Sequence, residues 1–172
     1  CALPICFQYG VAAVAVNWKI FGSSGETEKT DGLVMERFKK CSLRNFHANR
    51  NYKTIARPNL LAGFVTCHRV RVKNGSYLYL DGKKVKKECT GKGEHIDHKT
   101  IQLNHYFTKS RTEWEAKRER GRAPFPPEHP KRIRPNDIFL DLDRNEIEDL
   151  TILQFSEKTK IEMESLRKAI AS

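Results

Sequence analysis

The sequence lacks several features that would assign the chain to a common class of proteins. Its apolar run Val11–Val16 is far shorter than the roughly 20 residues that a membrane-spanning helix needs. It carries no cleavage signature of a secretory signal, and no basic stretch with the interleaved aromatics of an RNA-binding motif. We therefore expect neither a membrane span nor a conventional RNA-recognition module.

The sequence lacks cysteines at the spacing of a metal or redox motif. No two of the five cysteines form a C-x-x-C pair, and an odd count without a signal peptide indicates reduced thiols. A zinc site is a weaker alternative, because the spacing matches no usual zinc finger; its candidate ligands are Cys67, His68, Cys89, His95 and His98. We expect no disulfide bond and a cytoplasmic location, with association to a membrane left open.

Acidic residues are outnumbered by basic ones. The 172 residues include 32 Lys+Arg and 21 Asp+Glu, a formal net charge of +11, and 38% are hydrophobic, which fits one globular domain. Such a charge attracts phosphates, nucleic acid or an anionic membrane surface. Because acids separate the bases throughout, nucleic acid is not the expected partner. The alternative function is a basic nucleic-acid-binding module that uses Lys83–Lys87 and Lys131–Arg134.

The segment 101–121 combines a strand, a histidine and a helix start. Ile101, Leu103, His105 and Phe107 alternate at period two, which predicts a strand that brings an imidazole onto a packed face. Ser110 and Glu113 have the spacing of a capping box, so we expect a helix over 110–120 that packs through Trp114 and ends at Gly121. From the pattern alone, His105 is either a ligand of a metal or polar group or a hydrogen-bonded core residue.

Other strands follow from apolar runs and turn residues. Val11–Phe21 is typical of a buried central strand, and we expect it in one sheet with 101–106. Asn74-Gly75 between Val70–Lys73 and Ser76–Leu80 predicts a hairpin with a type I′ turn, which Asp81-Gly82 extends into a small antiparallel meander.

Further segments carry other signals. The small residues Gly22–Gly25 predict a flexible turn whose backbone can come close to a ligand. The same composition also serves an ordinary tight loop. Glu36 between Met35 and Phe38 is either a general base or a surface ion-pair partner. Prolines make 122–135 an extended loop, and 156–170 has the pattern of an amphipathic helix with Met163, Leu166 and Ile170 on one stripe.

Five motifs follow one another along the chain in a recognisable order. They are Asn17-Trp18-x-x-Phe21-Gly22-Ser23-Ser24-Gly25, Leu33-Val34-x-Glu36-Arg37-Phe38, Lys53-x-Ile55-x-Arg57-Pro58, Asn104-His105-Tyr106-x-x-Lys109-Ser110-x-x-Glu113-Trp114 and Asp143-x-Asn145-x-x-Glu148-Asp149. In these motifs the chain, from about Val11 to Phe155, is similar to a bacterial enzyme family, the family 2-like and family 92 group of GT-A glycosyltransferases.

The resemblance implies an α/β fold with a mixed sheet and flanking helices, and transfer of a sugar from a nucleotide-sugar donor to a carbohydrate or glycolipid acceptor. It implies that Glu36 is the acceptor base and that His105 completes a site for Mn²⁺ or Mg²⁺ and the diphosphate. It also implies donor contacts from Gly22, Ser23, Ser24 and Gly25. Lys109 and the helix start at Ser110 would add positive potential near the phosphates.

One part of the family pattern is missing. In such families the metal-binding D-x-D precedes the W-x-x-F-G block, whereas Asp141-Leu142-Asp143 follows the histidine block. A calcium loop from Asp141 fails too, because Glu146 and Ile152 stand where glycine and glutamate are needed. We expect a fragment, inactive without its donor-binding half, with 1–6 a non-native leader, 7–155 the C-terminal portion of the transferase domain and 156–172 a terminal helix. The leader is inferred because Cys-Ala-Leu-Pro-Ile matches one translated frame of a common sequencing adapter.

Overall fold

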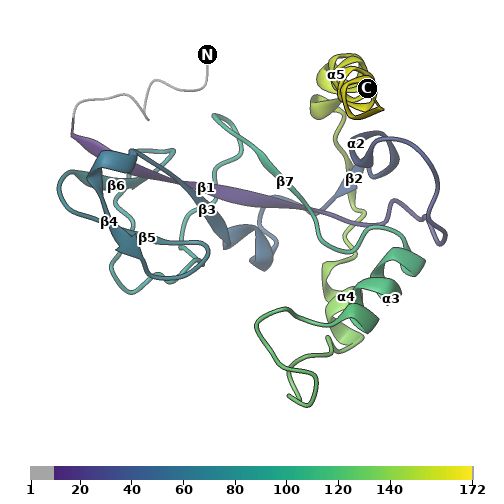
Figure 1. Cartoon of the computed structure of the whole chain (residues 1–172). Coiled ribbons are helices and arrows are strands. Elements are labelled where there is room, and N and C mark those ends of the chain that lie inside the picture. Colours follow the sequence, from purple (N-terminus) through teal and green to yellow (C-terminus); the bar gives the residue numbers. More distant parts are fainter. Residues whose placement is uncertain (1–9, 172) are drawn as a thin grey trace. The chain divides into compact units, whose positions relative to one another are not determined.

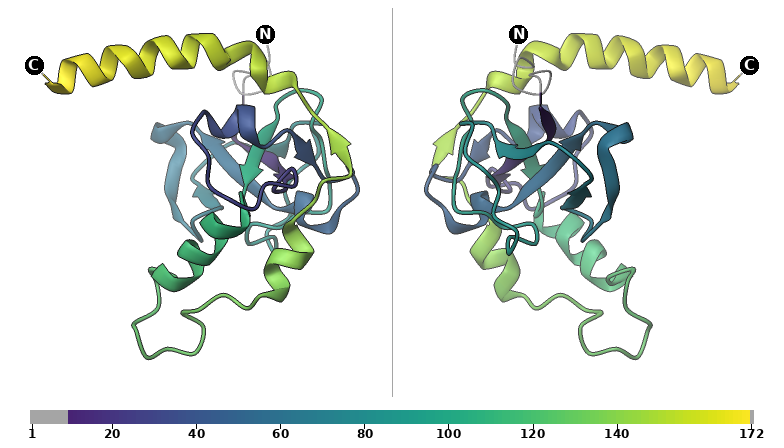
Figure 2. Two further views of the ribbon diagram at one scale, coloured as in Figure 1. Left: turned by 90° about the vertical axis from the view of Figure 1, so that its right-hand side faces the viewer. Right: turned by 90° about the vertical axis from the view of Figure 1, so that its left-hand side faces the viewer.

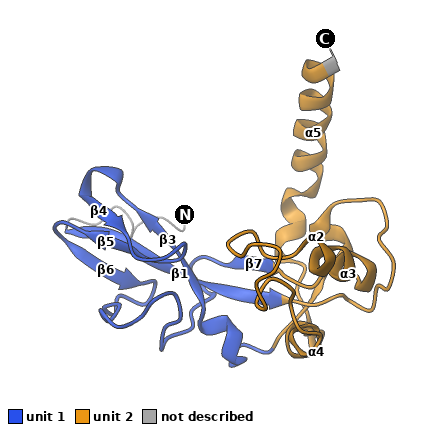
Figure 3. Cartoon of the chain, turned by 60° about the horizontal axis from the view of Figure 1, so that its bottom comes forward, with its two compact units in different colours: residues 1–20, 43–105 blue, residues 21–42, 106–172 orange. Residues whose placement is uncertain are grey.

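The computed structural model describes residues 10–171, so the predicted leader at 1–6 lies outside the described residues. The chain divides into two compact units, coloured separately in Figure 3. The first holds residues up to Ile20 together with Leu43–His105, and the second holds Phe21–Ser42 together with Tyr106–Ser172. Each unit is therefore built from two separated stretches of chain.

The first unit is organised around strand β1, Val11–Phe21 (Figure 1). Of this strand, only Phe21 belongs to the second unit. β3 (Tyr52–Ala56) pairs with β1 antiparallel, β6 (Ser76–Tyr79) pairs with it parallel, and β7 (Leu103–Tyr106) also pairs with it. Two 3-10 turns, η1 (His47–Arg50) and η2 (Pro58–Leu60), flank β3. β4 (Leu61–Phe64) and β5 (Val70–Val72) form a separate antiparallel pair.

Both faces of β1 are buried, as its continuous apolar run predicts. Ala13 and Ala15 pack on a cluster with Tyr52, Tyr77 and Tyr79. Val11, Val14 and Val16 pack on the other face, with Leu80 and the partly buried Leu103. The predicted central strand is confirmed, and so is its place in one sheet with the 101–106 segment.

A buried asparagine continues this strand. Asn17 is only 1% exposed, and its amide donates to the backbone oxygens of Asn49 and His95 at 3.2 and 2.9 Å. Its side-chain oxygen accepts from the Asp97 N–H at 3.1 Å. Asn49, also buried, accepts from the Ile20 N–H at 2.9 Å. These bonds fix two irregular segments to β1 and satisfy amide groups whose burial would otherwise be costly.

The regular structure of the second unit is mainly helical. Its helical elements are α2 (Val34–Arg37), α3 (Arg111–Arg120), α4 (Asp137–Leu142), the 3-10 turn η3 (Thr151–Phe155) and α5 (Ser156–Ala171). Figure 2 shows α5 as one continuous helix. β2 (Lys40–Cys41) pairs antiparallel with β8 (Ile147–Glu148), and Cys41 pairs with Phe21. None of the helices within 10–171 combines the length and apolar content needed to cross a bilayer.

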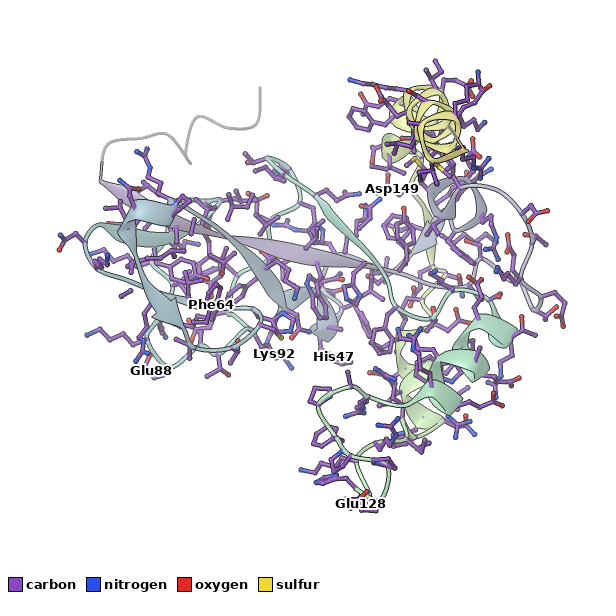
Figure 4. All side chains as sticks on the ribbon, viewed as in Figure 1. His47, Phe64, Glu88, Lys92, Glu128 and Asp149 are labelled. Atoms are coloured by element: carbon purple, nitrogen blue, oxygen red, sulfur yellow. The ribbon has the colours of Figure 1, made fainter. Side chains whose placement is uncertain are left out.

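The predicted helix and loop after β7 are confirmed. Ser110 and Glu113 form a complete capping box, and Gly121 ends α3 at a φ of 78°. Residues 121–136 then form an extended loop without helix or strand, with Glu128 near its tip (Figure 4). Arginine side chains organise this loop, since Arg132 donates to the Phe125 oxygen at 2.7 Å and Arg118 to the Arg134 oxygen at 2.8 Å.

The predicted hairpin at 70–80 is wrong. β5 pairs with β4 and β6 pairs with β1, so the Asn74-Gly75 turn carries the chain from one sheet to another. A type I′ turn needs positive φ at both central residues, but here only Gly75 has it (89°). The second predicted turn does form, because Gly82 reverses the chain and Leu78 pairs with Lys84.

The fold is thus mixed α/β, as predicted. Six strands of the described residues are linked in a mainly antiparallel sheet, and β4 with β5 makes the second sheet. The helix predicted for 156–170 is present as α5, but its stripe is exposed, with Met163 at 38%, Leu166 at 62% and Ile170 at 85%. That stripe is therefore not part of the core.

We predict that Trp114→Ala lowers the free energy of unfolding by about 3–5 kcal/mol. The indole is fully buried and packs against Phe107 and Phe139, with ring centroids 5.6 and 5.8 Å away. Urea unfolding followed by circular dichroism measures the change. Leu166→Ala, on exposed α5, is the control and should change the value by less than about 0.5 kcal/mol. Equal values for wild type and Trp114→Ala would contradict this packing.

Candidate functional site

A cationic pocket of about 390 Å³ lies along one face of α3 in the second unit. Its lining includes four basic side chains and one carboxylate: Lys29, Lys109, Lys117, Arg120 and Glu113. The neutral lining residues are Phe107, Thr108 and Ala116. A concave site with this excess of ammonium and guanidinium groups is suited to a compact anion such as a phosphate or diphosphate.

Two adjacent residues at this pocket are unusual. Thr108 is 1% exposed, and its buried hydroxyl has no hydrogen-bond partner among residues 10–171. Lys109 has a φ of 57°, a left-handed conformation that costs a residue with a Cβ about 1–2 kcal/mol. A strained backbone beside an unsatisfied hydroxyl is typical of positions kept for ligand contact rather than for stability.

Lys117 is the most perturbed cation of the pocket. Its ammonium donates to the Phe107 oxygen at 2.6 Å and lies 3.7 Å from the centroid of the Phe107 ring. Burial, followed by repulsion from Arg134, Lys109 and Arg120, lowers the pKa of Lys117 to about 8. A buried cation surrounded by other cations gains charge stabilisation when an anion enters the pocket.

Glu113 is already neutralised by other residues. Its carboxylate accepts from Arg37 at 2.9 Å and from the Ser110 hydroxyl at 2.8 Å, and it lies 3.6 Å from the Lys109 ammonium. Burial alone would raise the pKa of Glu113, but the bonds from Arg37 and Ser110 lower it. Glu113 stands four residues before Lys117 on α3, which is the spacing of a helical ion pair. Because Glu113 turns to Arg37, its charge does not cancel that of Lys117.

Ser110 and the start of α3 are occupied by the protein itself. Ser110 is fully buried within the capping box. The next two N–H groups, of Arg111 and Thr112, donate to the Glu26 and Thr27 oxygens at 3.4 and 2.9 Å. Ser110 thus orders the helix end in this structure, whereas the neighbouring Lys109 faces the pocket.

The loop predicted to approach a donor is packed against residues 143–145. The N–H groups of Ser23 and Ser24 donate to Asp143 and Asn145 at 2.5 and 2.7 Å. A Cβ at Gly22 would lie 2.5 Å from the Asn145 side-chain oxygen. The Ser24 hydroxyl accepts from the Lys39 and Lys40 N–H groups. The small residues of this loop therefore allow a close approach, but the group that approaches is the 143–145 segment of the same chain rather than a ligand.

Glu36 lies in a second pocket of about 510 Å³, whose lining also includes Asp31, Lys160 and Arg167. Its carboxylate is 2.7 Å from the Lys160 ammonium. The hydrogen bond from Lys160 lowers the pKa of Glu36, whereas a general base would benefit from a raised one. This pocket shares no lining residue with the α3 pocket, so the predicted base and Lys109 line different pockets.

His105 belongs to the first unit, where its ring stacks on Trp18 at 3.8 Å between centroids. His68 packs at a tilt on the same indole at 5.3 Å, and His98 hydrogen-bonds to the Trp18 oxygen at 2.8 Å. Burial lowers the pKa of both His68 and His98. The structure thus gathers histidines around one tryptophan, an association that the sequence spacing did not reveal.

No group of three metal-ligating side chains occurs within the part of the chain that the structure describes. His105 could supply one ligand, but Mn²⁺ and Mg²⁺ prefer near-octahedral sites with several oxygen donors. The described residues alone therefore do not fit the predicted metal. The predicted Mn²⁺ or Mg²⁺ site would need further ligands from outside the described residues.

Sequence reasoning identified Lys109 but missed Lys29, Thr108, Lys117 and Arg120. One available signal was helical spacing: Glu113, Lys117 and Arg120 recur at intervals of four and three residues, which brings them to one face of a helix. Lys29, by contrast, joins through tertiary folding.

We predict that pyrophosphate binding at the α3 pocket weakens by about tenfold as the pH rises from about 7 to 9. Lys117 loses its proton through a pKa of about 8, and the pocket loses a charged donor. Amide chemical shifts in NMR titrations measure the affinity. Lys117→Arg keeps its charge at both pH values, so it should flatten this dependence. A steep decline retained in Lys117→Arg would show that another group is responsible.

Comparison of the chain with protein-family models, curated proteins and solved structures finds no match.

Proposed function

We propose that this chain is the C-terminal portion of a metal-assisted GT-A-type glycosyltransferase, similar to the family 2-like and family 92 group. It would act in the transfer of a sugar from a nucleotide-sugar donor to an acceptor hydroxyl. The observation that carries the proposal is the cationic α3 pocket with Lys109 and Thr108 at its wall. Lys109 belongs to the Asn104–Trp114 motif of the resemblance.

The pocket's chemistry supports this proposal. Departure of a nucleoside diphosphate builds negative charge on its phosphate oxygens, and fixed cations stabilise that charge. Lys109 and Lys117 would supply two ammonium groups to the phosphate oxygens. Arg37 holds Glu113 at 2.9 Å, which keeps the carboxylate from repelling the phosphates at full strength.

The mixed sheet is compatible with the second half of such an enzyme. β1 and β6 run parallel, while most other pairs are antiparallel. The parallel nucleotide-binding sheet and the D-x-D motif would belong to a preceding half. The resemblance also implies Mn²⁺ or Mg²⁺ with His105 as one ligand, but the described residues do not form such a site, so no step of the proposal depends on the metal.

The nucleic-acid alternative receives less support. In the first basic stretch, Lys83 pairs with Asp81 at 3.2 Å and Lys86 pairs with Glu94 at 2.7 Å. In the second, Arg132 and Arg134 donate to backbone oxygens. These cations serve the protein's own structure, which leaves fewer of them to follow a phosphate backbone.

We predict that Glu36→Gln, in the gene product that carries this chain, lowers the transfer rate by roughly two to four orders of magnitude and leaves donor binding intact. A base acts on the acceptor hydroxyl, so its loss affects the chemical step. Transfer of radiolabelled sugar from a panel of nucleotide-sugars, with Mn²⁺ or Mg²⁺ present, measures the rate. Absence of transfer from every donor by the wild type would overturn the proposed function.

Lys160→Met tests whether Glu36 is the base rather than a structural residue. Lys160 lowers the pKa of Glu36, so its removal should raise that pKa and move the acid limb of the pH–rate profile to higher pH. Lys158→Met removes an exposed lysine of the same helix and should leave the acid limb in place. An acid limb unmoved by Lys160→Met would assign the base to another residue.

A further inference from the structure

A second cationic concavity lies in the first unit and shares no lining residue with the α3 pocket or with the pocket at Glu36. It has a volume of about 610 Å³ and lies beside β5, β6 and the segment after Gly82. This volume falls in the range of small-molecule sites. We refer to it as the β5–β6 groove, and its basic lining residues are Arg69, Arg71, Lys84 and Lys87.

None of the described residues that line the groove is acidic, so no carboxylate there balances these four cations. Arg69 is fixed at its base: the residue is 8% exposed, and its guanidinium donates to the Lys86 and Cys89 oxygens and lies 5.5 Å from the centroid of the Tyr77 ring. Lys84 and Lys87 are exposed. A buried guanidinium with flexible ammonium groups near it favours a doubly charged anion over a single carboxylate.

Most of the remaining lining residues are apolar. Val65, Val70, Val72, Val85 and Tyr77 contribute to it, and the Tyr77 ring is held by a hydrogen bond between its hydroxyl and that of Thr54. Contact with these side chains would remove an apolar or aromatic group from water. An inorganic anion would contact the cations of the groove but leave its apolar side chains without a partner.

We propose that the β5–β6 groove binds a phosphomonoester whose organic part is apolar or aromatic. The phosphate would lie against the cations, and the organic part against the valines and Tyr77. Both a nucleoside monophosphate and a lipid-like alkyl phosphate have this chemistry. The inference does not depend on the proposed transferase function, since it involves neither a diphosphate nor any residue of the α3 pocket.

The test is an NMR titration of this chain with hexyl phosphate, uridine monophosphate and inorganic phosphate. We expect at least one organic phosphate to bind about tenfold more tightly than inorganic phosphate, with shifts at the Val70, Val72 and Tyr77 amides. Preference for hexyl phosphate identifies a lipid-like ligand, and preference for uridine monophosphate identifies a nucleotide. Equal affinity for all three, or no binding, overturns the proposal.

The variant Lys84→Glu/Lys87→Glu should lower this affinity by at least tenfold. It leaves Arg69, whose bonds hold the 86–89 segment, untouched. Lys92→Glu/Lys99→Glu changes two other exposed lysines by the same charge and should have little effect. Circular dichroism melting checks that both variants fold. An equal loss of affinity in the two variants would indicate a general effect of net charge and would overturn the proposed phosphomonoester site. Binding of a single-stranded oligonucleotide that is tighter than that of the organic phosphates, and that weakens steeply with salt, would also overturn it.

Discussion

The burial of β1 on both faces is the constraint on which the first unit depends. A strand with no solvent face must have partners on both edges and apolar contacts above and below. Ala13 and Ala15 allow tyrosines to approach one face, while valines fill the other. Where the strand turns polar, Asn17 and Asn49 replace apolar packing by hydrogen bonds to irregular segments. Those bonds explain how long stretches without regular structure keep a defined path.

In the second unit, charge arrangement rather than apolar packing determines what the surface can do. Arg37 bridges Glu26 and Glu113 at 2.8 and 2.9 Å, so two carboxylates are committed to one guanidinium. The cations along α3 are left without an equal number of acids. Their mutual repulsion is seen in the lowered pKa of Lys117, whose burial is the larger cause. An anion bound among these cations would relieve their mutual repulsion and so stabilise the folded protein.

The loop at Gly22–Gly25 illustrates how one composition serves two purposes. Small residues permit a close approach of backbone, and the sequence suggested a ligand as the approaching group. In the structure the approaching group is the 143–145 segment, with Asp143 and Asn145 accepting from Ser23 and Ser24. Asp143 and Asn145 also stand at the end of the resemblance, so two distant motifs are joined by direct hydrogen bonds. Their association is structural, whatever further role they have.

The sequence by itself determined the elements whose signals are local. The capping box of α3, its glycine stop, the buried character of β1 and the proline-rich loop could all be predicted, because each depends on residues a few positions apart. Only the tertiary structure decided which strands pair, since Asn74-Gly75 can close a hairpin or carry the chain to another sheet. Only it placed Lys160 against Glu36 and Arg37 against Glu113, and thereby decided the direction of their pKa shifts. Those contacts join residues 124 and 76 positions apart (160 − 36 and 113 − 37), and no local pattern encodes such distances.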